Sequence, residues 1–490
     1  MMLLINHLER VLDMKIILSN VIIIENPTKD VMNFCKKELT YVNPQYARIK
    51  AMGYASYNIP KELKLYNIND NKLYIPYGFF EKLWSIHPIL DDYIDYTTTV
   101  PSNIVSKMTL RDYQEPSVIA LTEHCCGIFN VIVGMGKTNM ALECAARLKQ
   151  KTLWITHSGD LLQQSKERAE STLICKTSTI TEGKCDTSGD IVFSTIQTLI
   201  KYIEKGELSQ DLFGMTVTDE CHKCSCNPKS IQMFRTCIEY FSAKYRLGLT
   251  GSLWRSDGLE KCIEDIIGKS IYSIYQKKDE YLCEYDGNIL MKFPSYKFSV
   301  LPTVKIIETA YNIIDKPVYD KDGGTIQFAS LITNLAMDEE RNKLLIDTLN
   351  SLTGSTIVLS DRVEQLKYLS TKVNNGVEID GNTPKKIRKQ VLDDVRSGKI
   401  KYLFASYNLC REGLDCPILE NLVMATPVKA NSTVIQSIGR IMRKSPDKQT
   451  AYVYDFMDDV GMLYNFFNKR RSIYRKNNWQ IENVYLSEGK

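Results

Sequence analysis

Short apolar runs alternate with longer amphipathic stretches from residue 108 onward. The runs lie at 129–133, 153–155, 191–193, 215–217 and 245–249, and again at 356–359, 402–404, 422–425 and 451–454. Parallel strands buried on both faces give short continuous apolar runs of this kind, and the stretches between them are long enough for covering helices. The pattern predicts an α/β protein with two tandem domains, each a parallel sheet flanked by helices.

The first hundred residues have a different, mixed pattern. An apolar run at 21–24, a turn at 26–28 and a helix-like stretch at 30–39 predict a small α+β domain. Its interleaved aromatic and basic residues suit stacking on bases and contact with phosphates, and an ordinary solvated face is the alternative; they are Tyr41, Tyr46, Arg48, Lys50, Tyr54, Tyr57 and Lys61. We expect residues 1–13 to be an unstructured extension, because Met14 leads directly into an apolar run.

Proline and glycine interrupt the pattern between the two α/β domains. Pro294, Pro302, Pro317 and Gly323-Gly324 fall in one irregular stretch. We therefore divide the chain into an N-terminal domain at 1–100, a first α/β domain at 101–285, a linker or irregular subelement at 286–335, and a second α/β domain at 336–490 that ends in a basic tail helix.

Composition and charge narrow the class of protein and of partner. With 44% hydrophobic and 24% charged residues, the 490-residue chain is a folded globular protein and not a disordered one. The formal net charge is only +4, so a polyanion must be held by a local patch. The 14 cysteines stand in a long chain with no visible secretory signal and no run of 18 apolar residues, which predicts reduced thiols and a cytoplasmic protein that does not enter a membrane.

A glycine-rich turn follows the first predicted strand of the first α/β domain. Gly134-Met135-Gly136-Lys137-Thr138 separates that strand from an amphipathic helix. In this context the glycines admit phosphate oxygens to backbone N–H groups, Lys137 reaches the β- and γ-phosphates, and the Thr138 hydroxyl ligates magnesium. The strict pattern has a glycine where this chain has Val131, so a purely structural turn is the alternative.

Two adjacent carboxylates end another predicted strand of the same domain. Asp219 and Glu220 follow the run at 215–218 and precede Cys221 and His222. Ligands of open α/β sheets bind at the carboxyl ends of the strands. Asp219 can hold magnesium there, while Glu220 can accept a proton from the water that attacks a γ-phosphate.

A pair of arginines lies in the second α/β domain. Gln436, Arg440 and Arg443 fall within one predicted helix, with the two arginines on one face. An arginine from a second domain can neutralise charge on a transferring phosphoryl group. A basic surface helix is the alternative.

Taken together, these motifs resemble those of the superfamily 2 DExD/H-box helicases, in family order. The matching segments are 110–114 (Q motif), 134–138 (motif I), 155–164 (Ia), 193–199 (Ib), 219–222 (II), 249–252 (III), 356–360 (IV), 406–415 (V) and 436–443 (VI). The resemblance implies two RecA-like domains, ATP and Mg²⁺ as cofactors, and nucleic acid as the partner along which hydrolysis drives movement. The chain departs from the family pattern at His157, where proline is usual.

The resemblance also implies a role for each matching residue. It places Lys137, Asp219, Glu220, Gln436, Arg440 and Arg443 in catalysis. It places Arg111, Gln114, Gly134, Met135, Gly136, Lys137, Thr138, Gly413 and Asp415 on ATP, with Gln114 on the adenine edge, and Thr138 and Asp219 on magnesium. His222, Thr250 and Ser252 couple hydrolysis to domain motion, and Thr156, Thr195, Gln197, Ser360 and Ser406 contact nucleic acid, as do Lys469, Arg470 and Arg471 of the basic tail.

The layout of the chain resembles the XPB-type and UvsW-like phage recombination helicases. The shared features are an N-terminal domain, a short second α/β domain and a basic tail at 466–479. This resemblance implies a monomeric viral or phage helicase that acts on duplex, forked or branched DNA in preference to RNA. An RNA remodeller, the motor subunit of a restriction-type complex and a scaffold with an inactive ATPase are the alternatives, and the intact catalytic set disfavours the last.

A small cysteine cluster follows the second carboxylate motif. Cys221, His222, Cys224 and Cys226 have the chemistry of zinc ligands. A structural zinc site needs two ligand pairs, and no second pair stands at a suitable spacing, so we predict reduced loop cysteines.

Overall fold

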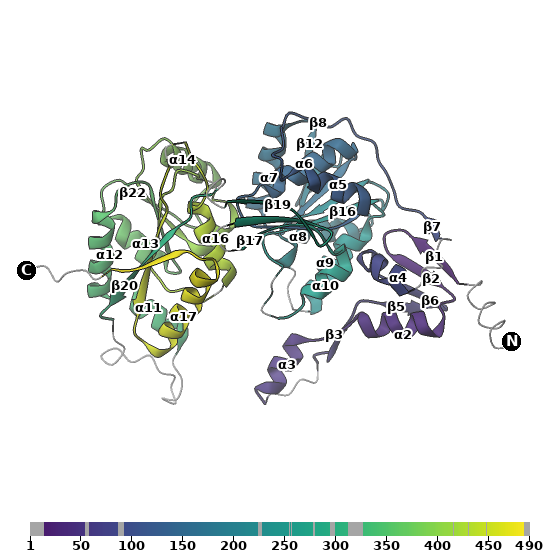
Figure 1. Cartoon of the computed structure of the whole chain (residues 1–490), viewed down its shortest axis with the longest axis horizontal. Helices are drawn as coiled ribbons and strands as arrows, with labels where there is room; N and C mark the ends of the chain where they lie inside the picture. Colours follow the sequence, from purple (N-terminus) through teal and green to yellow (C-terminus); the bar gives the residue numbers. More distant parts are fainter. Residues whose placement is uncertain are drawn as a thin grey trace, which may run out of the picture. The chain divides into compact units, whose positions relative to one another are not determined.

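The computed structural model describes residues 14–53, 58–86, 93–223, 228–253, 255, 257–277, 280–294, 299–311, 327–414, 416–429, 431–446 and 448–484. Its contacts divide the chain into two compact units (Figure 1). One comprises Met1–Tyr275 and Leu282–Lys292, and the other comprises Gln276–Tyr281 and Phe293–Lys490. The extension expected at residues 1–13 lies outside the described residues.

The N-terminal domain is a small α+β fold, as its mixed pattern predicts. Its sheet has the order β5 (Asn67–Asn69), β6 (Lys72–Ile75), β2 (Ile22–Glu25), β1 (Lys15–Leu18) and β7 (Tyr93–Asp95), and β3 (Thr40–Val42) pairs separately with β4 (Glu62–Lys64). Its helices are α2 (Lys29–Glu38), α3 (Pro44–Ala51), η1 (Tyr77–Phe79) and α4 (Phe80–Ile86). Helix α2 begins where the Thr28 side chain accepts a hydrogen bond from the Val31 amide.

This domain shares one hydrophobic core with the first α/β domain. The core joins Ile16, Leu73 and Phe79 on one side to Ile128, Ile263 and Ile267 on the other. Arg246 strengthens the contact, because its buried guanidinium lies 3.9 Å from the centre of the Tyr77 ring and donates hydrogen bonds to the carbonyls of Ser19 and Asn20. The N-terminal domain is therefore fixed on the α/β domain that follows it.

The first α/β domain is built on one ten-stranded sheet. The order is β13 (Lys184–Cys185), β12 (Thr177–Thr181), β14 (Ile191–Thr195), β10 (Thr152–Thr156), β15 (Met215–Thr218), β16 (Tyr245–Thr250), β9 (Cys126–Val131), β17 (Ser270–Lys277), β18 (Glu280–Tyr285) and β19 (Asn288–Pro294). The strands from β12 to β17 in this order run parallel. Every apolar run predicted as a strand in this domain is confirmed.

Helices and two short strands complete the domain. The helices are α5 (Glu115–His124), α6 (Lys137–Leu148), α7 (Gly159–Thr172), α8 (Ile196–Glu204), η2 (Cys221–Lys223), α9 (Pro228–Tyr240) and α10 (Glu260–Ile267). Strand β8 (Val105–Ser106) pairs with β11 (Leu173–Ile174). The order β15-β16-β9 places the carboxyl ends of three motif-bearing strands side by side.

The second unit contains a seven-stranded sheet in which every neighbouring pair is parallel. The order is β22 (Gly376–Ile379), β23 (Tyr402–Ser406), β21 (Thr356–Ser360), β24 (Asn421–Met424), β25 (Tyr452–Asp458), β20 (Thr303–Thr309) and β26 (Gln480–Val484). Its helices are α11 (Phe328–Ala336), α12 (Glu339–Ser351), α13 (Val363–Ser370), α14 (Lys385–Arg396), α15 (Tyr407–Gly413), α16 (Asn431–Ile441) and α17 (Gly461–Lys476).

Strand β20 lies inside the range that the sequence divides off as a linker. It pairs with β25 along Thr303–Thr309 and with β26 on its other side, so the second unit begins earlier than residue 336. Proline at 302 and at 317 brackets this strand and makes the stretch look irregular in the sequence. Residues 312–326 of the same range lie outside the described residues.

Candidate active site

The glycine-rich turn joins β9 to α6 in the geometry of a phosphate-binding loop. Gly134 and Gly136 have φ angles of 91° and 86°, which residues with a Cβ rarely adopt. Helix α6 begins at Lys137, directly after Gly136 as its N-cap. The first backbone N–H groups of a helix have no partner within the helix, and they carry the positive end of its dipole. This turn therefore has the backbone that an anion needs, in spite of Val131.

The Lys137 ammonium reaches across to the loop that follows β16. A Cβ on Gly251 would lie 3.5 Å from Lys137 Nζ, so glycine leaves room for the lysine at this position. The same ammonium lies near the carboxylates that follow β15, where its charge favours the ionised form of both Asp219 and Glu220. Residues from motifs I, II and III thus converge at one edge of the sheet.

Asp219 and Glu220 form a half-buried pair of carboxylates. Glu220 has a left-handed φ of 50°, and its amide donates a 2.9 Å hydrogen bond to Asp219 Oδ1. Burial and the neighbouring Glu220 charge raise the pKa of Asp219. Burial alone would also raise the pKa of Glu220, but Lys137 and His222 outweigh it and hold that pKa below its usual range. Such a pair is well matched to a divalent cation, which relieves the repulsion between two carboxylates.

His222 connects these carboxylates to motif III. Its Nδ1 lies 2.8 Å from Thr250 Oγ1 and 3.2 Å from Glu220 Oε2. Thr250 Oγ1 also lies 2.8 Å from the Ser252 carbonyl and accepts a hydrogen bond from the Ser252 amide at 3.1 Å. The three residues expected to couple hydrolysis to motion therefore form a chain of contacts from Ser252 through Thr250 to His222, and His222 contacts Glu220.

Arg255 fixes the backbone of this connection. Its guanidinium donates to the His222 carbonyl and pairs with Asp257, with a distance of 2.8 Å between Nε and Oδ1. A guanidinium can do both at once because its N–H groups point in fixed directions.

Gln114 contacts the phosphate-binding loop itself. Its side chain is 4% exposed, its Nε2 donates to the Met135 carbonyl at 2.9 Å, and its Oε1 accepts from the Arg111 amide at 3.0 Å. Both ends of the carboxamide are thus bonded to the chain, and each end keeps a second hydrogen-bonding position, so the contact with adenine stays a prediction. Arg111, the other ATP residue predicted here, has an exposed side chain that bonds Tyr113 Oη at 2.7 Å.

Motif VI departs from the single helix expected in the second unit. Gln436 and Arg440 lie one turn apart on α16, but that helix ends at Ile441. Arg443 forms an antiparallel bridge with Ser299 instead, so the prediction that both arginines share a helix face is wrong. The end is fixed by the Lys448 ammonium, which donates to the carbonyls of Ile441 and Arg443 and to those of Pro417 and Leu419. No sequence motif marked Lys448, although basic residues after a helix are a known C-terminal signal.

Three of the predicted nucleic-acid contacts are wrong because their side chains are buried. Thr156 and Ser360 are 0% exposed, and they donate to the Ser158 carbonyl and to Gln365 Oε1 at 3.0 and 2.8 Å. Arg470 is 1% exposed and pairs with Asp455. These three hydroxyl and guanidinium groups hold the fold together and do not face solvent.

The other predicted contacts are placed at the surface or near it. Gln197 and Lys469 are exposed, and Arg471 is half-buried. Thr195 and Ser406 are the half-buried N-caps of α8 and α15, where they accept from the amides of Thr198 and Leu409. Thr138 is half-buried in the first turn of α6, and Gly413 ends α15. Asp415, Cys224 and Cys226 lie outside the described residues.

In the part of the chain that the structure describes, no group of three or more His, Cys, Asp or Glu side chains could hold a metal ion, and the twelve cysteines there are free thiols. Among the described helices, none combines the length and apolar character required to cross a membrane.

Two family profiles match the chain. The family described as "Type III restriction enzyme, res subunit" matches residues 107–255, and "Helicase conserved C-terminal domain" matches residues 340–445. The first match includes the phosphate-binding loop, both carboxylates and the Thr250 loop. The second includes α16 and Arg443.

Curated relatives extend the similarity over nearly the whole chain. "Putative ATP-dependent RNA helicase L396" of Acanthamoeba polyphaga mimivirus is 28% identical over 92% of this chain and 83% of the relative. "Probable helicase D10" of Escherichia phage T5 is 25% identical over 95% of each. "DNA 3'-5' translocase XPB2" of Sulfurisphaera tokodaii is 26% identical over 75% of this chain and 86% of the relative. "ATP-dependent DNA helicase uvsW" of Enterobacteria phage T4 is 25% identical over 59% of this chain and 54% of the relative.

A solved structure supports the fold. S. cerevisiae Dbp5 bound to RNA and ADP BeF3 superposes with a TM-score of 0.52 at 15% identity, covering 83% of this chain and 95% of that one. At that identity the likeness concerns the architecture alone, which is two tandem RecA-like domains.

Proposed function

Since the chain is a superfamily 2 helicase that resembles the XPB and UvsW types and hydrolyses ATP, we propose that it is a translocase or helicase that acts on DNA. In this proposal each round of hydrolysis shifts the grip of the two α/β domains on a nucleic-acid backbone. The biological setting we propose is replication, recombination or repair in a virus or phage, in keeping with relatives from mimivirus and from phages T5 and T4.

The observation that carries the proposal is the convergence of Lys137, Glu220 and His222 at one edge of the sheet. We assign the backbone of the glycine-rich turn to the triphosphate and Lys137 to its β- and γ-phosphates. Thr138 and Asp219 would hold a magnesium ion, which supplies charge neutralisation at the phosphates when bound. Glu220, held ionised by its neighbours, accepts a proton from the attacking water.

The second α/β domain completes the site in this proposal. Arg440 and Arg443 would neutralise the charge on the transferring phosphoryl group, and an arginine in this role is worth about 10³ to 10⁵ in rate in comparable enzymes. Gln436 would contribute a hydrogen bond beside them. Turnover would then require the two domains to close on ATP. His222 would report the state of the phosphate to Thr250, because the two side chains share a hydrogen bond.

DNA is the polymer we favour. Two relatives are named as a DNA translocase and a DNA helicase. RNA is the second candidate, because the relative with 28% identity is named as an RNA helicase. A motor subunit of a restriction-type complex is a third candidate, favoured by the restriction-enzyme family that matches residues 107–255.

The experiment that tests the proposal is steady-state ATP hydrolysis with no polymer, single-stranded DNA, duplex DNA, forked DNA and RNA. Wild type is compared with Glu220→Gln in each case. Stimulation by duplex or forked DNA that disappears in the variant supports the proposal. Stimulation by RNA alone replaces DNA with RNA as the polymer, and stimulation by none of them points to a partner protein.

A further inference from the structure

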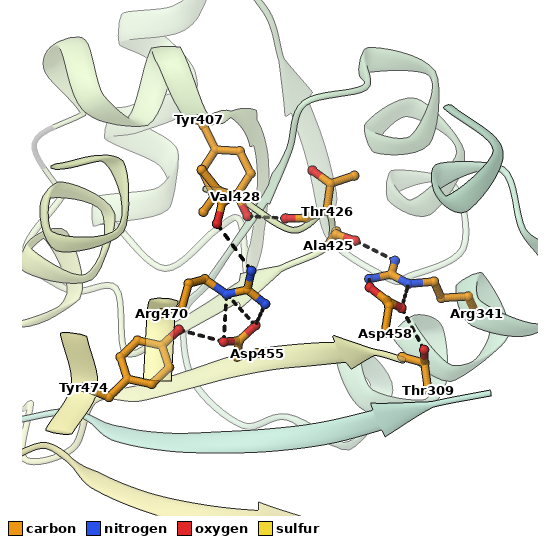
Figure 2. A network of polar contacts seen from close by, with 10 residues as sticks. All are labelled: Thr309, Arg341, Tyr407, Ala425, Thr426, Val428, Asp455, Asp458, Arg470 and Tyr474. Carbon is orange, nitrogen blue, oxygen red and sulfur yellow. Dashed lines mark hydrogen bonds and ion pairs between the residues drawn. The ribbon is translucent and has the colours of Figure 1, made fainter. Parts of the chain in front are cut away.

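The loop between β24 and α16 is bonded to buried side chains at three of its carbonyl groups (Figure 2). The donors are Arg341 to Ala425 at 2.6 Å, Tyr407 to Thr426 at 2.7 Å and Arg470 to Val428 at 3.3 Å. This loop, residues 425–429, precedes the helix that carries Gln436 and Arg440.

Two of the three donors are anchored on strand β25. Arg470 forms a bidentate ion pair with Asp455, with 2.7 Å between Nη2 and Oδ1 and 2.9 Å between Nε and Oδ2. The Tyr474 hydroxyl donates to the same carboxylate. Arg341 forms a bidentate ion pair with Asp458, with 2.7 Å between Nε and Oδ1 and 3.1 Å between Nη2 and Oδ2. Figure 2 shows the two ion pairs side by side, each with a guanidinium between its carboxylate and the loop.

Stability alone does not account for these ion pairs. Both arginines and both aspartates are at most 2% exposed. Taking such charges out of water costs about as much as their attraction returns, and apolar replacements of similar volume are often as stable. What an apolar replacement cannot supply is the direction of an N–H group. A buried guanidinium holds a carboxylate and a carbonyl at fixed angles, and this directional grip distinguishes it from lysine.

A further contact joins the loop to motif IV. The amide of Asp361, which follows β21, donates to Thr426 Oγ1 at 2.8 Å. Thr426 is thus bonded through its carbonyl and its hydroxyl to two different elements, β21 and α15. The loop therefore has little freedom to shift along the sheet edge.

We propose that Arg341, Tyr407 and Arg470 are positioning residues for motif VI. They hold the loop 425–429 so that α16 presents Gln436 and Arg440 in one orientation to the transferring phosphoryl group. This inference rests on the proposed function, because it assumes that motif VI acts on ATP. It assigns to Arg470 a role inside the second domain in place of a contact with nucleic acid.

The decisive variant is Tyr407→Phe, with Tyr402→Phe as its matched control. Both tyrosines are at most 3% exposed, and both donate through Oη to a backbone carbonyl, at 2.7 Å to Thr426 and at 2.6 Å to Leu349. Only the first carbonyl belongs to the loop that leads to α16. Each substitution removes one hydrogen bond and preserves the ring, so loss of folding is not expected.

The measurement is kcat and KM for ATP at saturating polymer, together with the dissociation constant of a non-hydrolysable ATP analogue. We expect Tyr407→Phe to lower kcat about 10-fold, because small misplacements of a catalytic group have effects of this order, while KM and analogue affinity stay within about 2-fold. Tyr402→Phe should keep the kcat of wild type. Equal kcat in Tyr407→Phe and wild type, or equal loss in both variants, overturns the proposal.

A second variant tests the ion pair. Arg470→Met combined with Asp455→Asn removes both charges, so no lone charge stays buried. We expect kcat to fall without a change in analogue affinity, and we expect Arg440→Ala to cause a smaller loss on this background than in wild type, since both changes act on one group. Full additivity with Arg440→Ala overturns the assignment of the pair to motif VI.

Arg440→Ala alone separates this inference from the proposed function. If that variant keeps the turnover of wild type, Arg440 has no catalytic role, and the part of the proposed function that places it at the phosphoryl group fails. If it abolishes turnover while the Tyr407 and Arg470 variants keep theirs, only the positioning role fails.

Discussion

His222 Nδ1 lies 2.8 Å from Thr250 Oγ1, and the threonine hydroxyl gives its own proton to the Ser252 carbonyl. The histidine that follows the Asp219 and Glu220 carboxylates is therefore bonded through Nδ1 to the loop of the neighbouring strand. His222 contacts both Glu220 and Thr250, so a displacement of His222 at the proposed phosphate site also affects the motif III loop.

Thr250→Val should remove the hydrogen bond between His222 and the motif III loop. The substitution keeps the side-chain shape and removes the acceptor for His222 Nδ1, a loss of about 1 to 1.5 kcal/mol, or about 10-fold in polymer-stimulated turnover. Steady-state kinetics with and without DNA measure this effect. Thr250→Ser, which keeps the hydroxyl, should retain stimulation, and an equal loss in the two variants would show that the methyl group matters instead.

Lys137→Ala and Glu220→Gln should separate binding from chemistry. Lys137→Ala removes the ammonium near the phosphates, so ATP affinity and turnover both fall. Glu220→Gln keeps the shape of the site and removes the base, so turnover falls by about 10²- to 10⁴-fold with ATP affinity retained. Titration with a fluorescent ATP analogue and a phosphate-release assay distinguish the two patterns, and near-normal release by Glu220→Gln contradicts its assignment as base.

Gly136→Ala should destabilise the protein more than Gly134→Ala. Both glycines have left-handed φ angles, near 90°, so each alanine costs about 1 to 2 kcal/mol of strain. At Gly136 the new Cβ would also lie 2.5 Å from Gln114 Nε2, whereas nothing lies within 4 Å at Gly134. Thermal unfolding without nucleotide measures the difference. Adding Gln114→Ala to Gly136→Ala should remove the extra loss, and its persistence would place the clash elsewhere.

The pH dependence of stability should include a contribution from Glu239. Burial raises its pKa to about 6, although Arg235 lies 2.7 Å away. Below pH 4.5 both folded and unfolded chains hold the proton, and as pH rises through 6 the folded chain must ionise a buried carboxyl. Stability therefore falls with rising pH, by about 2 kcal/mol at 1.36 kcal/mol per pKa unit. Urea unfolding of Glu239→Gln should show a stabilisation at pH 8 that is smaller at pH 5, and an equal effect at the two pH values contradicts it.

Neutralising Lys469 and Arg471, with Arg470 left intact, tests the basic tail. If each residue meets one phosphate of a single strand, the slope of log affinity against log salt should flatten by about 1.4. Fluorescence anisotropy with single-stranded DNA at several salt concentrations measures the slope. Lys476→Gln, at an exposed position of the same helix, serves as a control. An unchanged slope in the double variant would show that Lys469 and Arg471 do not contact the nucleic acid.

Strand positions and the edge that holds the site could be predicted because both follow from local pattern. The apolar runs locate β9, β15 and β16, and polar residues that directly follow a buried parallel strand necessarily lie at its carboxyl end. The convergence of Lys137, Asp219 and Thr250 then follows from the order of three neighbouring strands.

The direction of a side chain at a strand end could not be predicted in the same way. Every residue of β10 and β21 is buried, so these strands have no alternation to show that Thr156 and Ser360 point inward. Arg470 did carry a signal that the basic composition concealed. It stands four and three residues after Phe466 and Phe467, which are both buried, and thus on the inner face of α17. Its partner Asp455 on β25 depends on tertiary packing alone.

The common core of the N-terminal domain and the first α/β domain limits how this protein can be divided. Cys221, which follows the Asp219 and Glu220 carboxylates, belongs to the same apolar cluster as Ile16 and Leu73. Deleting the first hundred residues would expose the apolar faces of β9 and α10 to water. A shortened protein would therefore have to retain both domains of this unit, Met1–Tyr275 and Leu282–Lys292, to keep that core covered.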